Sequence, residues 1–318
     1  MFLNAIVISL KSKNHTVDKA LIYQSIYEVN TMFEENTDAF RKVQWPALFL
    51  NLKNRRLVPF LGAGASLVHN GSVGLPTGAE LASALARECA YTGNDIHDLP
   101  RVAQYFALAM GETNLRDSIE SKLSLSNVKP GEIHKIIAGW PVEVVLTTNF
   151  DSLMERAFAM FGKDPFAYCY ERRGNQQQIK TTPSINRPLV YKLHGSLDKK
   201  DTMVVTEDDT IDFLVSMIKG DPKIPDTIGS LFTKSSILFI GYGLKDWNIR
   251  VLLRYFRETQ ADIRSFAIQR FKPYGSEDQA AQEWESMVLY WEHKKISVYN
   301  CDALEFLREF DRRYRTEG

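Results

Sequence analysis

The sequence contains four short apolar runs, each of which ends in glycine or polar residues. They cover residues 57–61, 142–147, 189–193 and 237–240, and weaker runs follow at 266–268 and 296–299. Short apolar strands that alternate with helical stretches are typical of βα units around a parallel sheet. The sequence therefore predicts an α/β fold with a mostly parallel, six-stranded sheet. Pro59 argues against full pairing of the first strand on both of its sides.

Helical signals organise the rest of the chain. From residue 17 to residue 54 apolar residues recur at spacings of three and four, which predicts an N-terminal helical extension over residues 1–54. Residues 55–318 then form one α/β domain. The first two strands are much further apart than one crossover helix requires, so we predict a helical insertion at about residues 75–137. Thr77 opens a capping box, and Asp151 and Asp302 are placed to cap later helices.

Charge and cysteine content exclude several classes of protein. Lys plus Arg number 39 and Asp plus Glu number 39, so we expect no direct nucleic-acid binding by this chain alone, because gripping a phosphate backbone needs a basic surface. A small basic patch stays compatible with this balance. No apolar run approaches the roughly 18–20 residues of a membrane span. Cys89, Cys169 and Cys301 form no CxxC pair, so we expect no zinc site and no bound metal. Reduced thiols favour a cytoplasmic protein.

The first strand runs into a glycine turn, Gly62-Ala63-Gly64-Ala65-Ser66. A strand, a Gly-x-Gly turn and a helix form a phosphate-binding arrangement, because glycines let the backbone approach a pyrophosphate and N–H groups at a helix start can point at it. Leu67 stands where a dinucleotide-binding pattern would have a third glycine. The alternative is that the two glycines only make a tight turn.

Polar residues also follow the next three strong strands. These segments are Thr147-Thr148-Asn149-Phe150-Asp151, His194-Gly195-Ser196 and Gly241-Tyr242-Gly243. Each has a structural alternative: Asp151 as a helix cap, His194 as a core histidine, and the glycines as a turn. All four segments nevertheless fall at the carboxyl ends of predicted strands, where open α/β sheets bind their ligands. This convergence predicts a single active-site crevice.

In this order, the four segments resemble the signatures of sirtuins. The resemblance covers roughly residues 55–302, and the combination of motifs is specific although no single motif is. Sirtuins bind NAD+ on a Rossmann-like sheet and cleave its nicotinamide–ribose bond. The resemblance therefore implies a Rossmann-like fold with NAD+ as the substrate.

The resemblance also implies roles for individual residues. Asn149 would position a water or the ribose hydroxyls, Asp151 would help to seat the carboxamide, and His194 would be the general base. Further expected contacts to the nucleotide are Gly62, Ala63, Gly64 and Ser66 at the diphosphate, Thr148 and Gly195 next to the catalytic residues in sequence, Gly241 and Gly243 on the phosphate or adenosine side, and Asn300 near adenine.

The sequence departs from deacylating sirtuins in three places. It lacks their four-cysteine zinc module, residues 69–76 replace their Asp-Phe-Arg segment, and Gly241-Tyr242-Gly243 replaces their Gly-Thr-Ser strand end. These departures look like the bacterial sirtuin-like branch of antiphage defence, to which the segments at 194–198 and 205–208 are also similar. Members of that branch hydrolyse NAD+, so the resemblance implies an NAD+ hydrolase that acts by NAD+ depletion.

Two other functions stay open at this point. One is a module that senses NAD+ or an ADP-ribose-type nucleotide without turnover, against which Asn149 and His194 argue. The other, more distant, is an NAD+-dependent protein deacylase. Because constant NAD+ loss would be toxic, we expect control through a homo-oligomer or a regulatory partner. In the branch that the sequence resembles, partners include HerA-like ATPases and Argonaute-type modules.

Overall fold

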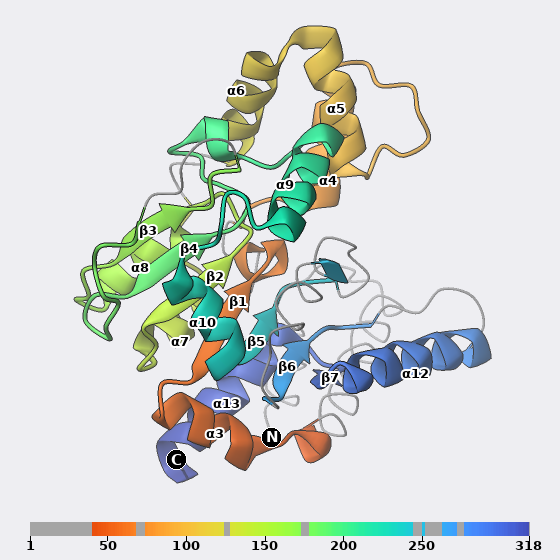
Figure 1. Cartoon of the computed structure of the whole chain (residues 1–318). Helices are drawn as coiled ribbons and strands as arrows, with labels where there is room; N and C mark the ends of the chain where they lie inside the picture. The colour runs from red at the N-terminus through yellow and green to blue at the C-terminus, as the bar shows by residue number, and fades with distance from the viewer. Residues whose placement is uncertain are drawn as a thin grey trace, which may run out of the picture.

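The computed structural model describes residues 40–67, 74–123, 128–172, 178–243, 250–251, 263–271 and 277–317. Its centre is a seven-stranded sheet in the order β3-β4-β2-β1-β5-β6-β7, and all the pairings between these strands are parallel (Figure 1). The strands are β1 (Leu57–Leu61), β2 (Val144–Thr147), β3 (Phe166–Cys169), β4 (Leu189–Lys192), β5 (Ser236–Ile240), β6 (Ser265–Ile268) and β7 (Ile296–Tyr299). The predicted α/β fold with a parallel sheet is confirmed.

β1 lies where the winding of the sheet changes direction. The chain places β2, β3 and β4 on one side of β1 and then β5, β6 and β7 on the other. Such a switch point creates a crevice at the carboxyl ends of the central strands. β1 pairs with β5 from Leu57 to Leu61 but with β2 only at Phe60 and Leu61. The ladder on the β2 side thus begins after Pro59, which agrees with the missing N–H of proline.

The sheet has one strand more than the sequence predicted. The additional strand, β3, forms the edge of the sheet and pairs with β4. Cys169 is the buried residue of β3, while Ala167 is exposed and the other two residues are half-buried. An edge strand that is partly open to solvent needs no continuous apolar run. For this reason it lacks the signal that marked the six predicted strands.

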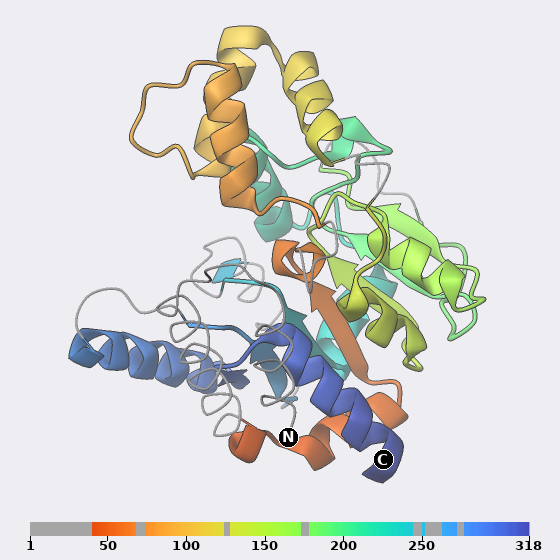
Figure 2. The same cartoon turned by 180° about the vertical axis from the view of Figure 1, so that it is seen from behind.

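Helices cover both faces of the sheet. One core is formed with α3 (Trp45–Lys53), α7 (Glu132–Gly139), α8 (Leu153–Met160) and α13 (Ala303–Glu317), and the opposite core with α9 (Glu207–Lys219), α10 (Asp226–Lys234) and α12 (Glu277–His293). Figure 2 shows α13, in dark blue, beside β1. Leu57 and Leu61 of β1 point into the first core, whereas Val58 and Phe60 point into the second. Burial on both faces explains why this strand is apolar throughout.

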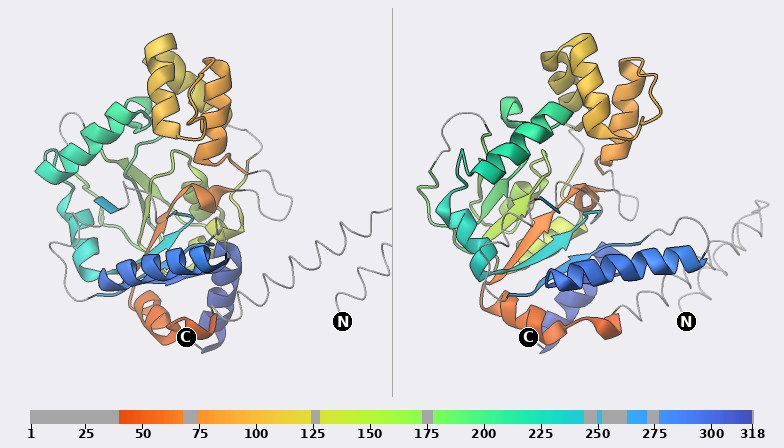
Figure 3. Two further views of the ribbon diagram at one scale, coloured as in Figure 1. Left: turned by 90° about the vertical axis from the view of Figure 1, so that its right-hand side faces the viewer. Right: turned by 45° about the vertical axis from the view of Figure 1, so that its right-hand side comes forward.

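Among the described residues, four α-helices lie between β1 and β2: α4 (Gly78–Glu88), α5 (Leu99–Met110), α6 (Glu112–Leu123) and α7. α4, α5 and α6 stand away from the sheet and build a separate small core (Figure 3). α4 begins with the predicted capping box, in which the Glu80 N–H donates to the Thr77 side chain. The division of the chain at residues 54 and 55 stays a prediction, and residues 1–39 of the predicted N-terminal extension lie outside the described residues.

The described ranges show neither a membrane span nor a cluster of metal-ligating side chains. None of their helices is both long enough and apolar enough to cross a bilayer. They contain no group of three or more His, Cys, Asp or Glu side chains that could hold a metal ion. The three cysteines are all buried as free thiols.

Candidate functional site

The glycine turn after β1 forms the centre of the candidate site. It folds into a short 3-10 helix, η1 (Ala63–Ser66). Because β2 and β5 flank β1, the segments that follow these two strands lie on either side of η1. The segment that follows β4 lies one strand further out, next to the end of β2.

The glycines after β1 and β5 pack against one another. The Gly62 N–H donates to Ile240 O at 2.9 Å, and the Gly64 N–H donates to Gly241 O at 3.0 Å. A Cβ atom on Gly62 would lie 2.6 Å from Gly241 O, and one on Gly64 would lie 2.7 Å from Gly241 Cα. Close backbone contact between two strand ends therefore requires these glycines. Ala63 is the exposed member of the turn, and diphosphate binding by the turn stays a prediction.

We expect Gly241→Ala to destabilise the fold and Gly243→Ala to leave its stability unchanged. Gly241 has a φ of +74°, and a Cβ there would lie 2.4 Å from Ala65 N; a Cβ on Gly243 would meet no described atom within 4 Å. Backbone strain and overpacking typically cost about 1–3 kcal/mol each. Urea unfolding followed by circular dichroism measures both variants. Equal midpoints would contradict the close packing of the two strand ends.

Ser66, Asn149 and Asp151 form one hydrogen-bonded cluster, hereafter the Ser66 cluster, with His134 of α7 as its fourth member. Ser66 Oγ donates to Asp151 Oδ2 at 3.1 Å. Asn149 Nδ2 donates to Ser66 Oγ at 3.3 Å and to Gly62 O at 3.1 Å. His134 Nε2 lies 3.4 Å from Ser66 Oγ. Ser66 is 5% exposed and His134 is 1% exposed, so water has little access to the hydroxyl at the centre of the cluster.

These contacts fix the orientation of both functional groups after β2. The amide nitrogen of Asn149 is bonded to the protein, whereas its amide oxygen Oδ1 accepts no hydrogen bond from any described residue. Oδ1 is therefore the atom that Asn149 can offer to a ligand or a water. Asp151 Oδ1 accepts the Leu153 N–H, the first of α8, at 2.9 Å, while Oδ2 holds Ser66. The N-cap of α8 is Ser152, so the helix begins one residue later than predicted and Asp151 bonds its first N–H from the position before the cap.

The Tyr242 hydroxyl connects the segment after β5 to the segment after β2 through hydrogen bonds. Its hydroxyl donates to Leu61 O at 2.9 Å and so accepts from Thr148 Oγ1, which is 2.8 Å away. The ring packs edge-on against Phe60 with centroids 4.9 Å apart. The Thr148 hydroxyl is thus engaged within the protein, and its predicted contact to the nucleotide stays a prediction.

His194 follows β4, but its ring packs on α9 and does not bond to the Ser66 cluster. The ring meets Phe213 edge-on, with centroids 4.9 Å apart. His194 is half-buried as a residue, yet its Nε2 atom is buried and has no hydrogen-bond partner among the described residues. Burial, together with the positive charge of Arg172, lowers the pKa of His194 to about 4. The imidazole is therefore neutral near pH 7 and can accept a proton or hydrogen bond from a ligand.

Because the pKa of His194 is lowered in the folded protein, we expect the contribution of His194 to the free energy of unfolding to decrease as the pH falls. An unfolded histidine has a pKa of about 6.5, so between about pH 6.5 and pH 4 the unfolded state binds more protons than the folded state. The contribution is complete above pH 6.5 and is lost as the pH falls toward 4. We expect the wild type to lose more unfolding free energy than His194→Phe between pH 7 and pH 5, measured by urea denaturation. Equal losses of unfolding free energy in the wild type and in His194→Phe would contradict the lowered pKa of His194.

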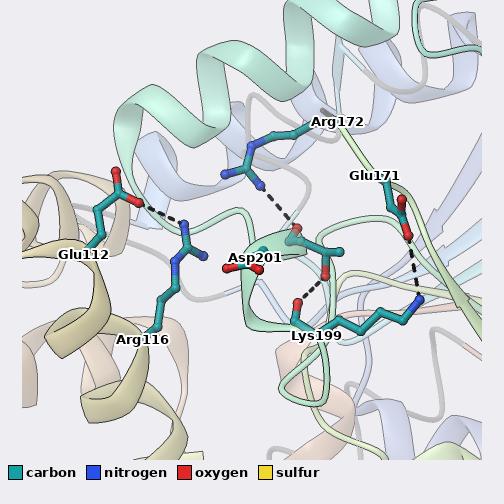
Figure 4. Close-up of a pocket in the computed structure, with 7 residues that line it drawn as sticks. Glu112, Arg116, Glu171, Arg172, Lys199 and Asp201 are labelled. Atoms are coloured by element: carbon teal, nitrogen blue, oxygen red, sulfur yellow. Dashed lines mark hydrogen bonds and ion pairs between the residues drawn. The ribbon is translucent and has the colours of Figure 1, made fainter. Parts of the chain in front are cut away.

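A cavity of about 480 Å³ is lined by residues that follow β3 and β4 in the chain and by residues of α6 (Figure 4). None of the predicted site residues lines it; its walls are Glu112, Arg116, Glu171, Arg172, Lys199, Asp201 and Thr202. The two arginines are committed to the protein: Arg116 donates to Lys200 O at 2.6 Å, and Arg172 donates to Met203 O at 2.8 Å and pairs with Asp209. The polar groups of this cavity, hereafter the junction, are therefore largely engaged with one another and with the backbone.

The loop after His194 closes tightly over this junction. Gly195 has a φ of +86°, and a Cβ there would lie 2.4 Å from the backbone of Thr202. Ser196 donates its N–H to Thr202 Oγ1 at 3.2 Å. Only glycine fits position 195 without strain, so this residue shapes the loop that carries His194, and its predicted role at the nucleotide stays a prediction.

Two predicted residues lie apart from the Ser66 cluster. Asn300 follows β7 at the edge of the sheet, and its Oδ1 accepts the Phe271 N–H at 2.9 Å. Gly243 is exposed after β5. The structure does not bring either residue into contact with the Ser66 cluster, and their contacts to the nucleotide stay predictions.

Sequence reasoning assigned no role to the Tyr242 side chain within its predicted segment, and it did not point to His134 or Lys192 at all. Lys192 of β4 is 1% exposed; its ammonium donates to the Asp151 carbonyl and lies 3.0 Å from Glu155 Oε1. A lysine inside an otherwise apolar strand is a signal that could have revealed it, because a buried charge needs a partner. His134 gave no such signal, since one histidine on the apolar face of a helix is also compatible with simple packing.

Comparisons with known proteins agree with the motifs. Residues 143–299 match the family model described as SIR2-like domain. The chain is 30% identical over 204 residues to "NAD(+) hydrolase ThsA" of Bacillus cereus, covering 62% of this chain and 39% of that protein. It is 28% identical over 267 residues to "Defense-associated sirtuin 2" of Bacillus subtilis, covering 81% and 24%. The chain thus spans less than half the length of these curated relatives.

A solved structure titled "Structural Basis for the Mechanism and Regulation of Sir2 Enzymes" also matches. The match covers 88% of this chain and 100% of the other, at 14% identity and a TM-score of 0.39. This likeness is too weak to add to the fold described above.

Proposed function

The protein carries a SIR2-like domain and is sirtuin-like, and from that premise we propose that it is an NAD+ hydrolase of bacterial antiphage defence. It would cleave the nicotinamide–ribose bond, release nicotinamide and ADP-ribose, and act by depleting NAD+. The relatives named as an NAD+ hydrolase and as a defence-associated sirtuin support this proposal. The structural observation that carries it is the buried, unbonded Nε2 of a neutral His194, on the strand end next to that of Asn149.

In the proposed reaction each residue has a defined part. Departure of nicotinamide leaves an oxocarbenium-like ribose, so the site must hold the ribose and admit a single water. Asn149 Oδ1 orients that water, or a ribose hydroxyl, without adding a charge. His194 accepts its proton. Asp151, held by Ser66 and by the start of α8, helps to seat the carboxamide.

The rest of the dinucleotide would extend across the switch point. The turn of Gly62, Ala63, Gly64 and Ser66 would face the diphosphate, with Thr148 and Gly195 on the nicotinamide side. Gly241 and Gly243 would face the phosphate or adenosine side, and Asn300 would lie toward adenine. The position of β5, β6 and β7 in one direction from β1 supports this order.

Incubation of the purified protein with NAD+, with and without an acetylated peptide, tests the proposal. Nicotinamide and ADP-ribose in equal amounts, independent of peptide, is the expected result and can be quantified by chromatography with mass spectrometry. NAD+ binding without products would instead indicate a sensing module. Peptide-dependent O-acetyl-ADP-ribose would indicate a deacylase.

The control of this activity is also part of the proposal. A cytoplasmic enzyme that destroys NAD+ must be restrained before infection, so we propose a homo-oligomer or a regulatory partner such as a HerA-like ATPase or an Argonaute-type module. Native mass spectrometry of the protein, alone and with the product of its neighbouring gene, distinguishes these arrangements.

A further inference from the structure

We propose that His134 is a positioning residue of the active site, acting through the Ser66 hydroxyl on Asn149 and Asp151. It belongs to α7, in the segment between β1 and β2, 68 residues along the chain from Ser66. The kinetic part of this proposal rests on the NAD+ hydrolase activity proposed above. Its structural part, the proton arrangement around Ser66, does not.

The donors and acceptors around Ser66 Oγ determine where its proton lies. A serine hydroxyl has one proton to donate and two lone pairs that accept. The proton goes to Asp151 Oδ2, 3.1 Å away, because a carboxylate is the strongest acceptor present. One lone pair accepts from Asn149 Nδ2 at 3.3 Å. The second lone pair is left for His134 Nε2 at 3.4 Å, so Nε2 must carry a proton and donate.

The helix that carries His134 is firmly held. Arg308 of α13 makes two hydrogen bonds to Glu132, at 2.8 and 2.6 Å, in the first turn of α7. Ile133 and Ile137 on either side of His134 are fully buried in the core under the sheet. His134 is therefore a rigid donor, and it holds the Ser66 hydroxyl in the one rotamer that serves both Asn149 and Asp151.

Loss of this donor should disturb orientation more than binding. Without it, Ser66 Oγ can rotate, and the amide of Asn149 keeps only its bond to Gly62 O as a fixed reference. A misplacement of the order of 1 Å at a reacting group can cost about 10²-fold in rate. We therefore expect kcat to fall while KM changes little.

The variants His134→Leu, His134→Gln, Ser66→Ala and the double variant Ser66→Ala/His134→Leu test the proposal in the full chain. Leucine removes the donor, whereas the amide of glutamine restores an N–H. We expect kcat for NAD+ cleavage to fall about 10- to 100-fold in His134→Leu, to recover substantially in His134→Gln, and to fall no further when His134→Leu is added to Ser66→Ala. His97→Leu, at an exposed histidine 2.9 Å from the Ser83 hydroxyl, is the matched control and should be unchanged.

Nitrogen-15 NMR of the imidazole rings gives a readout that needs no activity. We expect His134 to show a protonated Nε2 in the wild type and a shifted Nε2 signal in Ser66→Ala. An unprotonated Nε2, or kinetic losses that simply add in the double variant, would overturn the proposal. If the wild type cleaves no NAD+, the proposed function fails, and the NMR result alone decides the place of His134.

Discussion

Asn149→Ala should abolish NAD+ cleavage and leave the protein folded. The alanine removes the one amide oxygen that the Ser66 cluster presents to a ligand, together with the bonds from Nδ2 to Gly62 O and Ser66 Oγ. Loss of a preorganised polar group of this kind typically costs about 10² to 10³ in kcat. Nicotinamide release under saturating NAD+ measures the effect.

The exposed Asn114 supplies a matched control for that variant. Asn114 belongs to α6, away from the sheet, and its amide donates at 2.6 Å to the O atom of Met110 at the end of α5. Asn114→Ala should therefore retain wild-type turnover. Thermal unfolding of both variants shows whether any loss comes from the site or from the fold. Undiminished cleavage by Asn149→Ala would remove this residue from the mechanism.

His194→Ala should be at least as damaging to catalysis. A positioned general base contributes about 10² to 10⁴-fold to a reaction, and His194 has the neutral ring and the buried, unbonded Nε2 that this role needs. Because alanine also leaves a gap beside Phe213, His194→Phe should be made in parallel. It fills the space and offers no base.

We expect both His194 variants to lose NAD+ cleavage, and His194→Phe to keep its fold at pH 7. His293→Ala, at an exposed position near the end of α12, controls for the removal of a histidine and should be fully active. If His194→Phe still consumed NAD+ at the wild-type rate, the ring would have only a packing role, and the alternative in which His194 is a core histidine would hold.

Local features of the chain were enough to predict most of the architecture. Apolar runs of three to six residues predicted β1, β2, β4, β5, β6 and β7, because strands buried on both faces must be apolar at successive positions. Thr77 and Asp302 predicted helix starts that the structure confirms, since a cap acts within three residues of itself. β3 was not predicted because a half-exposed edge strand does not need apolar residues at successive positions.

The sequence by itself determined which segments end at one edge of the sheet, and hence that Ser66, Asn149, Asp151 and His194 belong to one region. Only the tertiary structure decided how they are held. It placed His134 against Ser66, packed Gly241 against Gly62 and Gly64, and set the His194 ring against Phe213 with its Nε2 buried. Strand and helix signals act over a few residues, whereas hydrogen bonds, close backbone contacts and pKa shifts depend on groups that are distant in sequence and meet only when the helices pack on the sheet.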